Sequence, residues 1–301
     1  DWAKTVTGLE KSVIISGSLI IILIILFWTM VTAKKNPIGW GAMAYPQLVL
    51  GMIAIFIYVG VEVTIDNNFG ALLKKNAFGG KEDSQISHLI SLYWGSMMIG
   101  RWTGAVSVFN FSKTVKRILV IVVPFAAFGL ILLVNIIKGN EISEFAMYPI
   151  CIAIAVIAFL YAEDKPVKLL LTVSVLAAVA MLISITTTGM LANYAIISTG
   201  LCTAVMWPCI FALAINGIGK YTSQGSAFLI MMILGGAIIP PTQGSIIDLD
   251  PSGDANVYTF TQLSYLVPLA CFAYLAWHAI QTRSVLKKQG LDVDAQVAAS
   301  H

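Results

Sequence analysis

Charged side chains are scarce in this sequence of 301 residues, and their scarcity excludes most water-soluble folds. Only 11% of the residues are Asp, Glu, Lys or Arg, whereas roughly 25% is usual in a soluble domain. Hydrophobic residues make up 58% of the chain, and the mean hydropathy is +0.87. A soluble protein of this length would not cover its surface with so few charges. The sequence therefore predicts a protein whose main solvent is lipid.

The signatures of several other protein classes are also missing. The four cysteines (Cys151, Cys202, Cys209 and Cys271) lie in apolar runs without CxxC spacing, so neither a metal site nor a disulfide framework is indicated. No P-loop, zinc-protease, nucleophile-elbow or acidic metal-pair motif occurs, so we expect no enzyme, no ATP-driven engine and no cofactor. A net charge of +3 without a Lys/Arg-dense stripe gives no indication of a nucleic-acid partner.

Long apolar runs are present instead, and we count nine of them. None shows the strict alternation of an outer-membrane strand. A backbone in lipid must satisfy its own hydrogen bonds, so each run is predicted to be a helix. The predicted fold is an all-α polytopic membrane protein with about nine transmembrane helices. The runs are 13–32, 46–66, 88–109, 118–137, 145–162, 167–186, 191–215, 226–247 and 257–281.

Lysine and arginine are unevenly divided between the two predicted sides of the membrane. Twelve lie on one side and six on the other, which also carries Asp248, Asp250 and Asp254. The positive-inside rule makes the richer side cytoplasmic, in a multi-pass protein of the inner (plasma) membrane. Asp1 is then outside and His301 inside, and this start without a signal sequence leads us to expect helices upstream. The loops predicted to be cytoplasmic are 33–45, 110–117, 163–166 and 216–225.

Glu62 is the most informative polar residue inside an apolar run. It lies 15 residues beyond Gln47, or roughly 22 Å into a hydrocarbon core of about 30 Å, past the midplane. Tyr58, Glu62 and Asp66 are spaced i, i+4, i+8 and share one helix face. Such a face is costly against lipid and favourable against a water-filled cavity. The alternative is a neutral acid, hydrogen-bonded to a neighbouring helix for structural reasons.

The two residues after Asp66, which are Asn67 and Asn68, are equally compatible with cavity lining and with a helix end. Arg101 lies near the cytoplasmic end of its run and has two interpretations. Its side chain extends to the membrane surface, or its guanidinium clamps a carboxylate or helix C-termini as part of an inner gate.

Prolines interrupt two of the later runs. Pro208, after Trp207, lies in 191–215, and Pro240-Pro241 lies in 226–247. Proline removes an intrahelical hydrogen bond and kinks the helix, and such helices can expose backbone carbonyls to a substrate cavity. Pro240 is thus a candidate hinge, or a packing feature only. Gln243 offers an amide to a hydroxylated ligand, and Gly235-Gly236 indicates a close helix contact.

Four separated segments form a distinctive series along the chain. They are Tyr58-Val59-Gly60-Val61-Glu62-Val63, then Tyr93-Trp94-Gly95 with Ile99-Gly100-Arg101-Trp102-Thr103-Gly104, then Met206-Trp207-Pro208-Cys209-Ile210-Phe211-Ala212-Leu213, and finally Thr222-Ser223-Gln224-Gly225-Ser226 with Gly235-Gly236-Ala237-Ile238-Ile239-Pro240 and Gln243-Gly244. In this order they resemble the fucose/glucose/galactose–proton symporter family of the major facilitator superfamily.

The resemblance implies two six-helix halves around a central sugar cavity. Residues 1–32 would then hold the last helix of the N-terminal half, 33–45 the cytoplasmic loop between halves, 46–283 the C-terminal half and 284–301 a cytoplasmic tail. The coupling carboxylates of this family lie mainly in the N-terminal half, which this chain would lack and would require as a partner.

The sequence departs from the family pattern in two places. Eight runs follow residue 45 where the family has six helices, so we expect a two-helix insertion within 118–186. We expect 145–186 to form a peripheral hairpin, because its only charges lie at its turn. Asp66-Asn67-Asn68 also stands where the resemblance implies a small, serine-containing stretch, which leaves the sugar open.

These observations predict a secondary active transporter that takes up a monosaccharide (glucose, galactose or fucose class) with protons by alternating access. The alternatives are a transporter of another small polar solute and a non-transporting membrane sensor or scaffold on the same fold. The expected partners are the sugar, protons and membrane lipid, with no metal. The candidate substrate-binding residues are Glu62, Tyr58, Asn67, Asn68 and Gln243, and the candidate gating residues are Arg101, Trp207, Pro208 and Pro240.

Overall fold

The computed structural model describes residues 8–35, 40–139, 142–163, 165–250 and 259–292, and no strand occurs within them. The expected termini, Asp1 and His301, and Asp254 lie outside these ranges. The helices are α2 (Gly8–Lys35), α3 (Pro46–Leu73), α4 (Asp83–Ala105), α5 (Lys113–Ile137), α6 (Tyr148–Ala162), α7 (Pro166–Thr186), α8 (Gly189–Thr203), α9 (Met206–Ile215), α10 (Thr222–Met231), α11 (Gly235–Ile247), α12 (Phe260–Leu263) and α13 (Leu266–Lys288).

Eight segments of the described chain are long and apolar enough to cross a membrane. They account for eight of the nine expected runs, with α8–α9, α10–α11 and α12–α13 each forming one crossing. The remaining run, 88–109, is α4, which has 23 residues but more polar side chains. The chain is therefore an all-α, multi-pass membrane protein, as its composition predicts.

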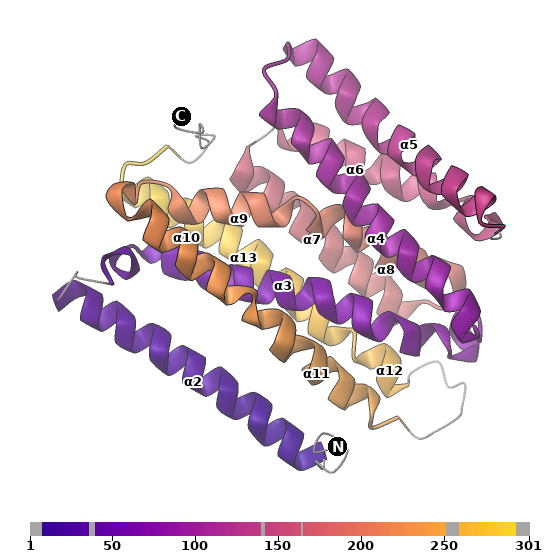
Figure 1. Cartoon of the computed structure of the whole chain (residues 1–301), viewed down its shortest axis with the longest axis horizontal. Helices are drawn as coiled ribbons and strands as arrows, with labels where there is room; N and C mark the ends of the chain where they lie inside the picture. Colours follow the sequence, from indigo (N-terminus) through magenta and orange to yellow (C-terminus); the bar gives the residue numbers. More distant parts are fainter. Residues whose placement is uncertain (1–7, 36–39, 140–141, 164, 251–258, 293–301) are drawn as a thin grey trace.

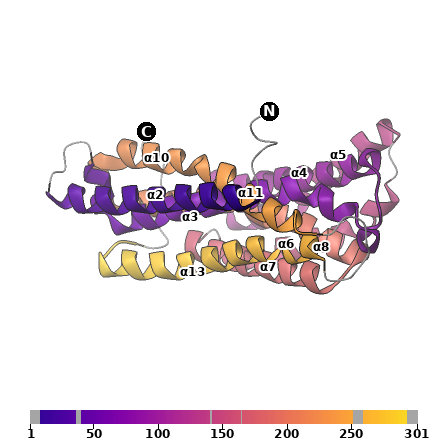
Figure 2. The same ribbon diagram turned by 90° about the horizontal axis from the view of Figure 1, so that it is seen from below.

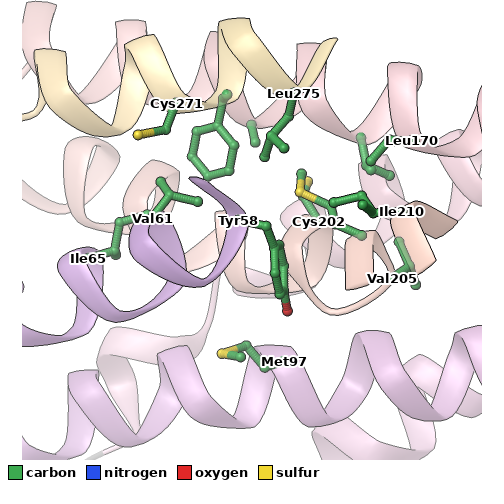
Figure 3. Close-up of a cluster of buried hydrophobic side chains, with 14 of the residues drawn as sticks. Tyr58, Val61, Ile65, Met97, Leu170, Cys202, Val205, Ile210, Cys271 and Leu275 are labelled. Carbon is green, nitrogen blue, oxygen red and sulfur yellow. The ribbon is translucent and has the colours of Figure 1, made fainter. Parts of the chain in front are cut away.

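Helix α3 is the central element of the fold. It packs against α11, α13 and α9, while α7 packs between α13 and α8 (Figure 1). The turned view shows α13 and α7 in one layer and α3 and α4 in the other (Figure 2). Between them lies an apolar core that includes Val61 of α3, Cys202 of α8 and Leu275 of α13 (Figure 3). Because one face of α3 is buried in this core, the polar residues of α3 can lie only on its other faces.

The breaks in the later helices do not coincide with the prolines. Helix α8 ends at Thr203 and α9 starts at Met206, so Pro208 lies in the first turn of α9. A backbone N–H has no intrahelical partner there, so proline costs little at that position. Helices α10 and α11 are separated by a 3₁₀ turn, Met232–Leu234, whereas Pro240 lies inside α11.

The close contact expected at Gly235-Gly236 is confirmed. A Cβ on Gly235 would collide with the backbone carbonyl of Phe56 on α3, and one on Gly236 would crowd Val59 and Val63. Small residues at a membrane helix contact allow the backbones to approach closely.

The peripheral helices are α5 and α6, which lie at one edge of the molecule (Figure 1). The expectation that 145–186 forms a peripheral hairpin is wrong for α7, because α7 packs against α13, α8 and α9. Few charges indicated a lipid-facing helix, but a buried core helix has equally few. That a two-helix insertion lies within 118–186 remains a prediction.

Polar contacts fasten this pair to the rest of the bundle. Tyr148, at the start of α6, is fully buried, and its hydroxyl is hydrogen-bonded to Ser96 of α4. The loop before α6 is held by Glu144, which forms an ion pair with Lys81 and a hydrogen bond with His88.

Contacts between loops show which helix ends lie on the same side of the molecule, and the grouping agrees with the one predicted from the charges. Lys75, after α3, forms an ion pair with Asp250, after α11. At the opposite end, Gln289 donates to the side chain of Gln47 at 2.8 Å, and Gln47 donates to the carbonyl of Asn216 at 3.0 Å. The identity of the cytoplasmic side remains a prediction from the lysine and arginine count.

Candidate functional site

An ion pair inside the predicted membrane region joins α3 to α4. Arg101 Nη2 donates to Glu62 Oε1 at 3.0 Å. The Glu62 side chain is 12% exposed and that of Arg101 is 54% exposed, so the pair lies at the edge of the bundle, open on one side. The carboxylate is buried enough to need a partner, whereas the guanidinium that meets it remains largely exposed.

Two tyrosines lie next to Glu62. Tyr58 precedes it by one turn on the same helix, and its side chain is buried. In Figure 3 Tyr58 extends from α3 toward Met97 of α4, which places its hydroxyl on the face of α3 that meets α4. Tyr93 donates to the Glu62 backbone carbonyl at 3.1 Å. The predicted face of Tyr58, Glu62 and Asp66 is therefore real, and α4 lies along it.

Arg101 contacts the carboxylate of Glu62. Of the two interpretations of this residue, the structure shows the carboxylate contact. A gating role for Arg101 stays a prediction.

A second contact between α3 and α4 lies one turn beyond the ion pair. Trp94 Nε1 donates to Asp66 Oδ1 at 2.7 Å, and the tryptophan is 46% exposed. The sequence analysis did not single out Trp94 as a site residue. Its spacing of seven from Arg101 places both on one face of α4, and this was the signal that could have found it.

Trp207 of α9 lies beside the same site. Its ring meets that of Tyr58 edge-on, with 6.0 Å between the centroids. Trp207 is half-buried and Pro208 is exposed next to it. The broken α8–α9 segment thus brings an aromatic side chain to the ion pair, whereas Pro240 is buried within α11 and away from solvent.

Gln243 and Asn68 belong to a different cluster. Gln243 is fully buried, accepts from Thr64 Oγ1 at 2.9 Å and donates to Ser264 Oγ at 3.0 Å. Asn68 donates to the Thr64 carbonyl at 2.9 Å. Asn67, by contrast, is exposed on α3. The structure therefore brings Glu62 and Tyr58 together with Arg101 and Trp207, and separates Gln243 and Asn68 from them.

The described residues contain no cluster of three or more His, Cys, Asp or Glu side chains suited to a metal ion. The arrangement at Glu62 offers hydrogen-bond acceptors, one cation and aromatic rings, with one side open. Such a mixture suits a small polyhydroxylated molecule.

Comparisons with known proteins agree with this chemistry. No protein-family model matches the chain. The glucose/galactose transporter of Brucella abortus (strain 9-941) is 28% identical over 247 residues, 82% of this chain and 44% of that protein. The L-fucose-proton symporter of Haemophilus influenzae is 33% identical over 99 residues, 33% of this chain and 22% of that protein. The crystal structure of FucP, a major facilitator superfamily transporter, in the outward conformation matches with a TM-score of 0.54 and 19% identity, over 79% of this chain and 42% of that one.

The chain thus spans less than half the length of these relatives. Their names describe transporters, which supports the expectation that the chain is not an enzyme. The resemblance seen in the sequence motifs is confirmed: the chain is similar to glucose/galactose transporters and L-fucose-proton symporters, and it has the fold of a major facilitator superfamily transporter over the matched part.

Proposed function

We propose that this chain forms part of a secondary active transporter that takes up a monosaccharide of the glucose, galactose or fucose class together with protons. The observation that carries the proposal is the half-open Glu62–Arg101 ion pair within a membrane-spanning segment. Ionisable residues in membrane-spanning segments are rare, pair with one another, and mark substrate and proton pathways. The names of the relatives supply the substrate class and the proton coupling.

Glu62 is the residue that exchanges partners in this proposal. A carboxylate oxygen accepts charge-assisted hydrogen bonds from sugar hydroxyls as well as from a guanidinium. Arg101 neutralises the carboxylate while the site is empty, which lowers the cost of keeping a charge in the membrane. Sugar hydroxyls or a proton then take over part of that task, and Arg101 is released to move with α4. Tyr58 keeps the carboxylate oriented throughout.

The remaining part of the transporter is proposed to complete the site. Glu62, Arg101 and Trp207 lie on an open side of the bundle, and the relatives are more than twice as long as the region they share with this chain. A second half of the same polypeptide, packed over this side, would enclose the sugar between two bundles. Alternating access is then the rocking of one half against the other, with the lysine-rich loops on the cytoplasmic side of an inner membrane.

The test is uptake by the complete polypeptide that carries this sequence, purified into proteoliposomes. Labelled glucose, galactose and L-fucose are offered under an inward proton gradient, an inward sodium gradient and no gradient. We expect accumulation of at least one sugar under the proton gradient only. Accumulation driven by sodium would contradict proton coupling. If none of the sugars enters, another polar solute or a non-transporting role replaces this proposal.

A further inference from the structure

Helices α3 and α4 are joined by two side-chain contacts arranged as successive rungs. The inner rung is Glu62–Arg101 at 3.0 Å, and the outer rung is Asp66–Trp94 at 2.7 Å. Glu62 and Asp66 are four residues apart on α3, about 6 Å along its axis, whereas Trp94 and Arg101 are seven residues apart on α4, about 10 Å. The two rungs thus leave room for a molecule the size of one hexose between their exposed ends.

The two rungs differ in charge. Glu62 faces a guanidinium, whereas Asp66 receives its bond from the neutral indole N–H of Trp94. Within the described part of the chain, no lysine or arginine forms an ion pair with Asp66, and Trp94 bonds to only one of its oxygens. A carboxylate in a membrane-spanning segment is costly unless charged or polar partners meet it. Asp66 therefore retains acceptor capacity on a half-exposed face.

Trp94 contributes more than a hydrogen bond. It is 46% exposed, and the edge-to-face contact with Tyr93, at 6.2 Å between centroids, limits how its ring can turn. The bond to Asp66 fixes the indole nitrogen as well. A fixed aromatic surface beside a carboxylate can take the apolar face of a sugar ring while the carboxylate takes a hydroxyl.

We propose that Asp66 and Trp94 form the specificity-determining end of the sugar site. In this arrangement Asp66 accepts a hydrogen bond from one ring hydroxyl, Trp94 packs against the ring, and Glu62–Arg101 binds the opposite end of the same pyranose. The inference rests on the proposed sugar transport and adds to it the residue that selects among hexoses. The inference also assigns a function to the Asp66 carboxylate, which stands where the family resemblance implies a small, serine-containing stretch.

If Asp66 binds one sugar hydroxyl, the deoxy sugar that lacks this hydroxyl should be taken up less efficiently by a predictable factor. Sites built to bind a substrate hydroxyl reject the analogue that lacks it by up to about 10⁴-fold. For a half-open site we expect the mono-deoxy analogue lacking the hydroxyl bound by Asp66 to lose roughly a hundredfold in uptake efficiency. The other mono-deoxy analogues lose less, because their missing hydroxyls do not face a carboxylate.

The experiment is a cycle of variants and analogues in proteoliposomes of the complete polypeptide. Each mono-deoxy analogue of the transported hexose is measured against the parent sugar for the unmodified protein, Asp66→Asn, Trp94→Phe and Asp83→Asn. Asp83 is the matched control, because it is an aspartate in an exposed ion pair with Lys74 at 2.8 Å, distant from both rungs. For Asp66→Asn we expect the ratio of uptake efficiencies between the parent sugar and one mono-deoxy analogue to fall to about tenfold or less. This is the preference that an ordinary, uncharged polar contact would give.

Trp94→Phe should weaken discrimination at the same ring position, because it keeps an aromatic ring but removes the N–H that orients Asp66. The double variant Asp66→Asn/Trp94→Phe should discriminate between the sugars about as poorly as Asp66→Asn alone, since the effects of residues that act as a unit are not additive. Equal loss for all sugars in Asp66→Asn, without a preferred ring position, would overturn the inference. Absence of sugar uptake by the unmodified protein would instead overturn the proposed function, so the two failures are distinguishable.

Discussion

Helix α3 carries two polar stripes, and they differ in what their side chains have left to bind. Glu62 and Asp66 face α4 on the side where the bundle is open. Thr64 and Asn68 face α11 and α12, where Gln243 and Ser264 complete their hydrogen bonds. The first stripe has charged groups with exposed partners, and the second consists of neutral groups that are buried.

The difference shows that polar residues of one membrane helix can have two separate roles, which are helix packing and ligand binding. Neutral amides and hydroxyls that bond to one another connect helices, with modest energies per contact. Charged groups with spare acceptors on an open face are available to a ligand. The comparison predicts that substitutions on the open stripe change transport, whereas substitutions on the buried stripe change stability.

The largest effect is expected for Glu62→Gln. The amide keeps the shape and one acceptor but loses the charge that Arg101 and the sugar compete for. Uptake by the complete polypeptide should fall by about a hundredfold or more, comparable to loss of an essential charge-assisted contact. The thermal midpoint should change little. Uptake at the unmodified level would show that the glutamate is structural and that the binding site lies elsewhere.

Arg101→Lys should have a smaller effect of the same kind. Lysine retains the positive charge but lacks the planar guanidinium, so the contact to Glu62 loses its geometry. We expect roughly a tenfold loss of uptake efficiency, measured as the ratio of maximal rate to half-saturating sugar concentration. Restoration of full uptake by lysine would mean that only the charge matters, and Arg101→Gln serves as the neutral control.

The matched change on the buried stripe is Gln243→Ala. It removes the acceptor of the Thr64 hydroxyl and the amide that donates to the Ser264 hydroxyl, so the transporter should lose about 0.6–2 kcal/mol of stability. Sugar affinity measured in detergent below the unfolding temperature should stay within about twofold, because the residue does not reach the open face. A large loss of affinity with unchanged stability would place Gln243 in the sugar site, as its position in the sequence first indicated.

The smallest effect concerns the ion pair between Lys75 and Asp250, outside the membrane-spanning segments. Burial alone would raise the pKa of Asp250, but hydrogen bonds from Lys75 and Thr261 outweigh it and hold that pKa below its ordinary value. A lowered folded-state pKa stabilises the protein above the unfolded pKa, and this stabilisation is lost as the pH falls through the folded value. Asp250→Asn should therefore cost about 1 kcal/mol or less at neutral pH.

The same variant should remove part of the loss of stability below the ordinary aspartate range. Thermal unfolding measured from neutral to acidic pH checks this, with Asp83→Asn as the exposed-pair control. An identical acid profile for Asp250→Asn and the unmodified protein would show that the pair contributes nothing.

Periodicity and composition predicted the helices and the grouping of the loops, and they singled out Glu62, which the structure places in contact with Arg101. Lipid tolerates few polar groups, so each one is informative. The position that a long side chain reaches within the membrane was harder to infer. Arg101 was placed near a helix end by counting along an apolar run, but its long side chain reaches Glu62. Gln243 was indistinguishable from a ligand-binding amide, since only tertiary contacts reveal that Thr64 and Ser264 already satisfy it.

Helix breaks were predicted in the correct two runs, 191–215 and 226–247, but at the wrong positions within them. The prolines were the visible cause of a break, but Pro208 occupies a first turn where its missing N–H is harmless. The actual interruption at Met232–Leu234 directly precedes the position where Gly235 presses on the Phe56 carbonyl. Contacts of this kind depend on a partner helix far away in the sequence.

The buried Tyr148 gives the peripheral helices an evolutionary constraint. Its ring contacts those of Phe128 and Tyr194, and its hydroxyl bonds to Ser96 and, at 3.4 Å, to the Ile197 carbonyl. A chain that lost α5 and α6 would leave a tyrosine-sized hollow and polar groups of α4 and α8 facing lipid. An apolar residue at Ser96 would in turn remove one of the two hydrogen-bond partners of the Tyr148 hydroxyl and leave only the Ile197 carbonyl. We therefore expect α5, α6 and the residues around Ser96 to change together in related sequences, because each stabilises the other.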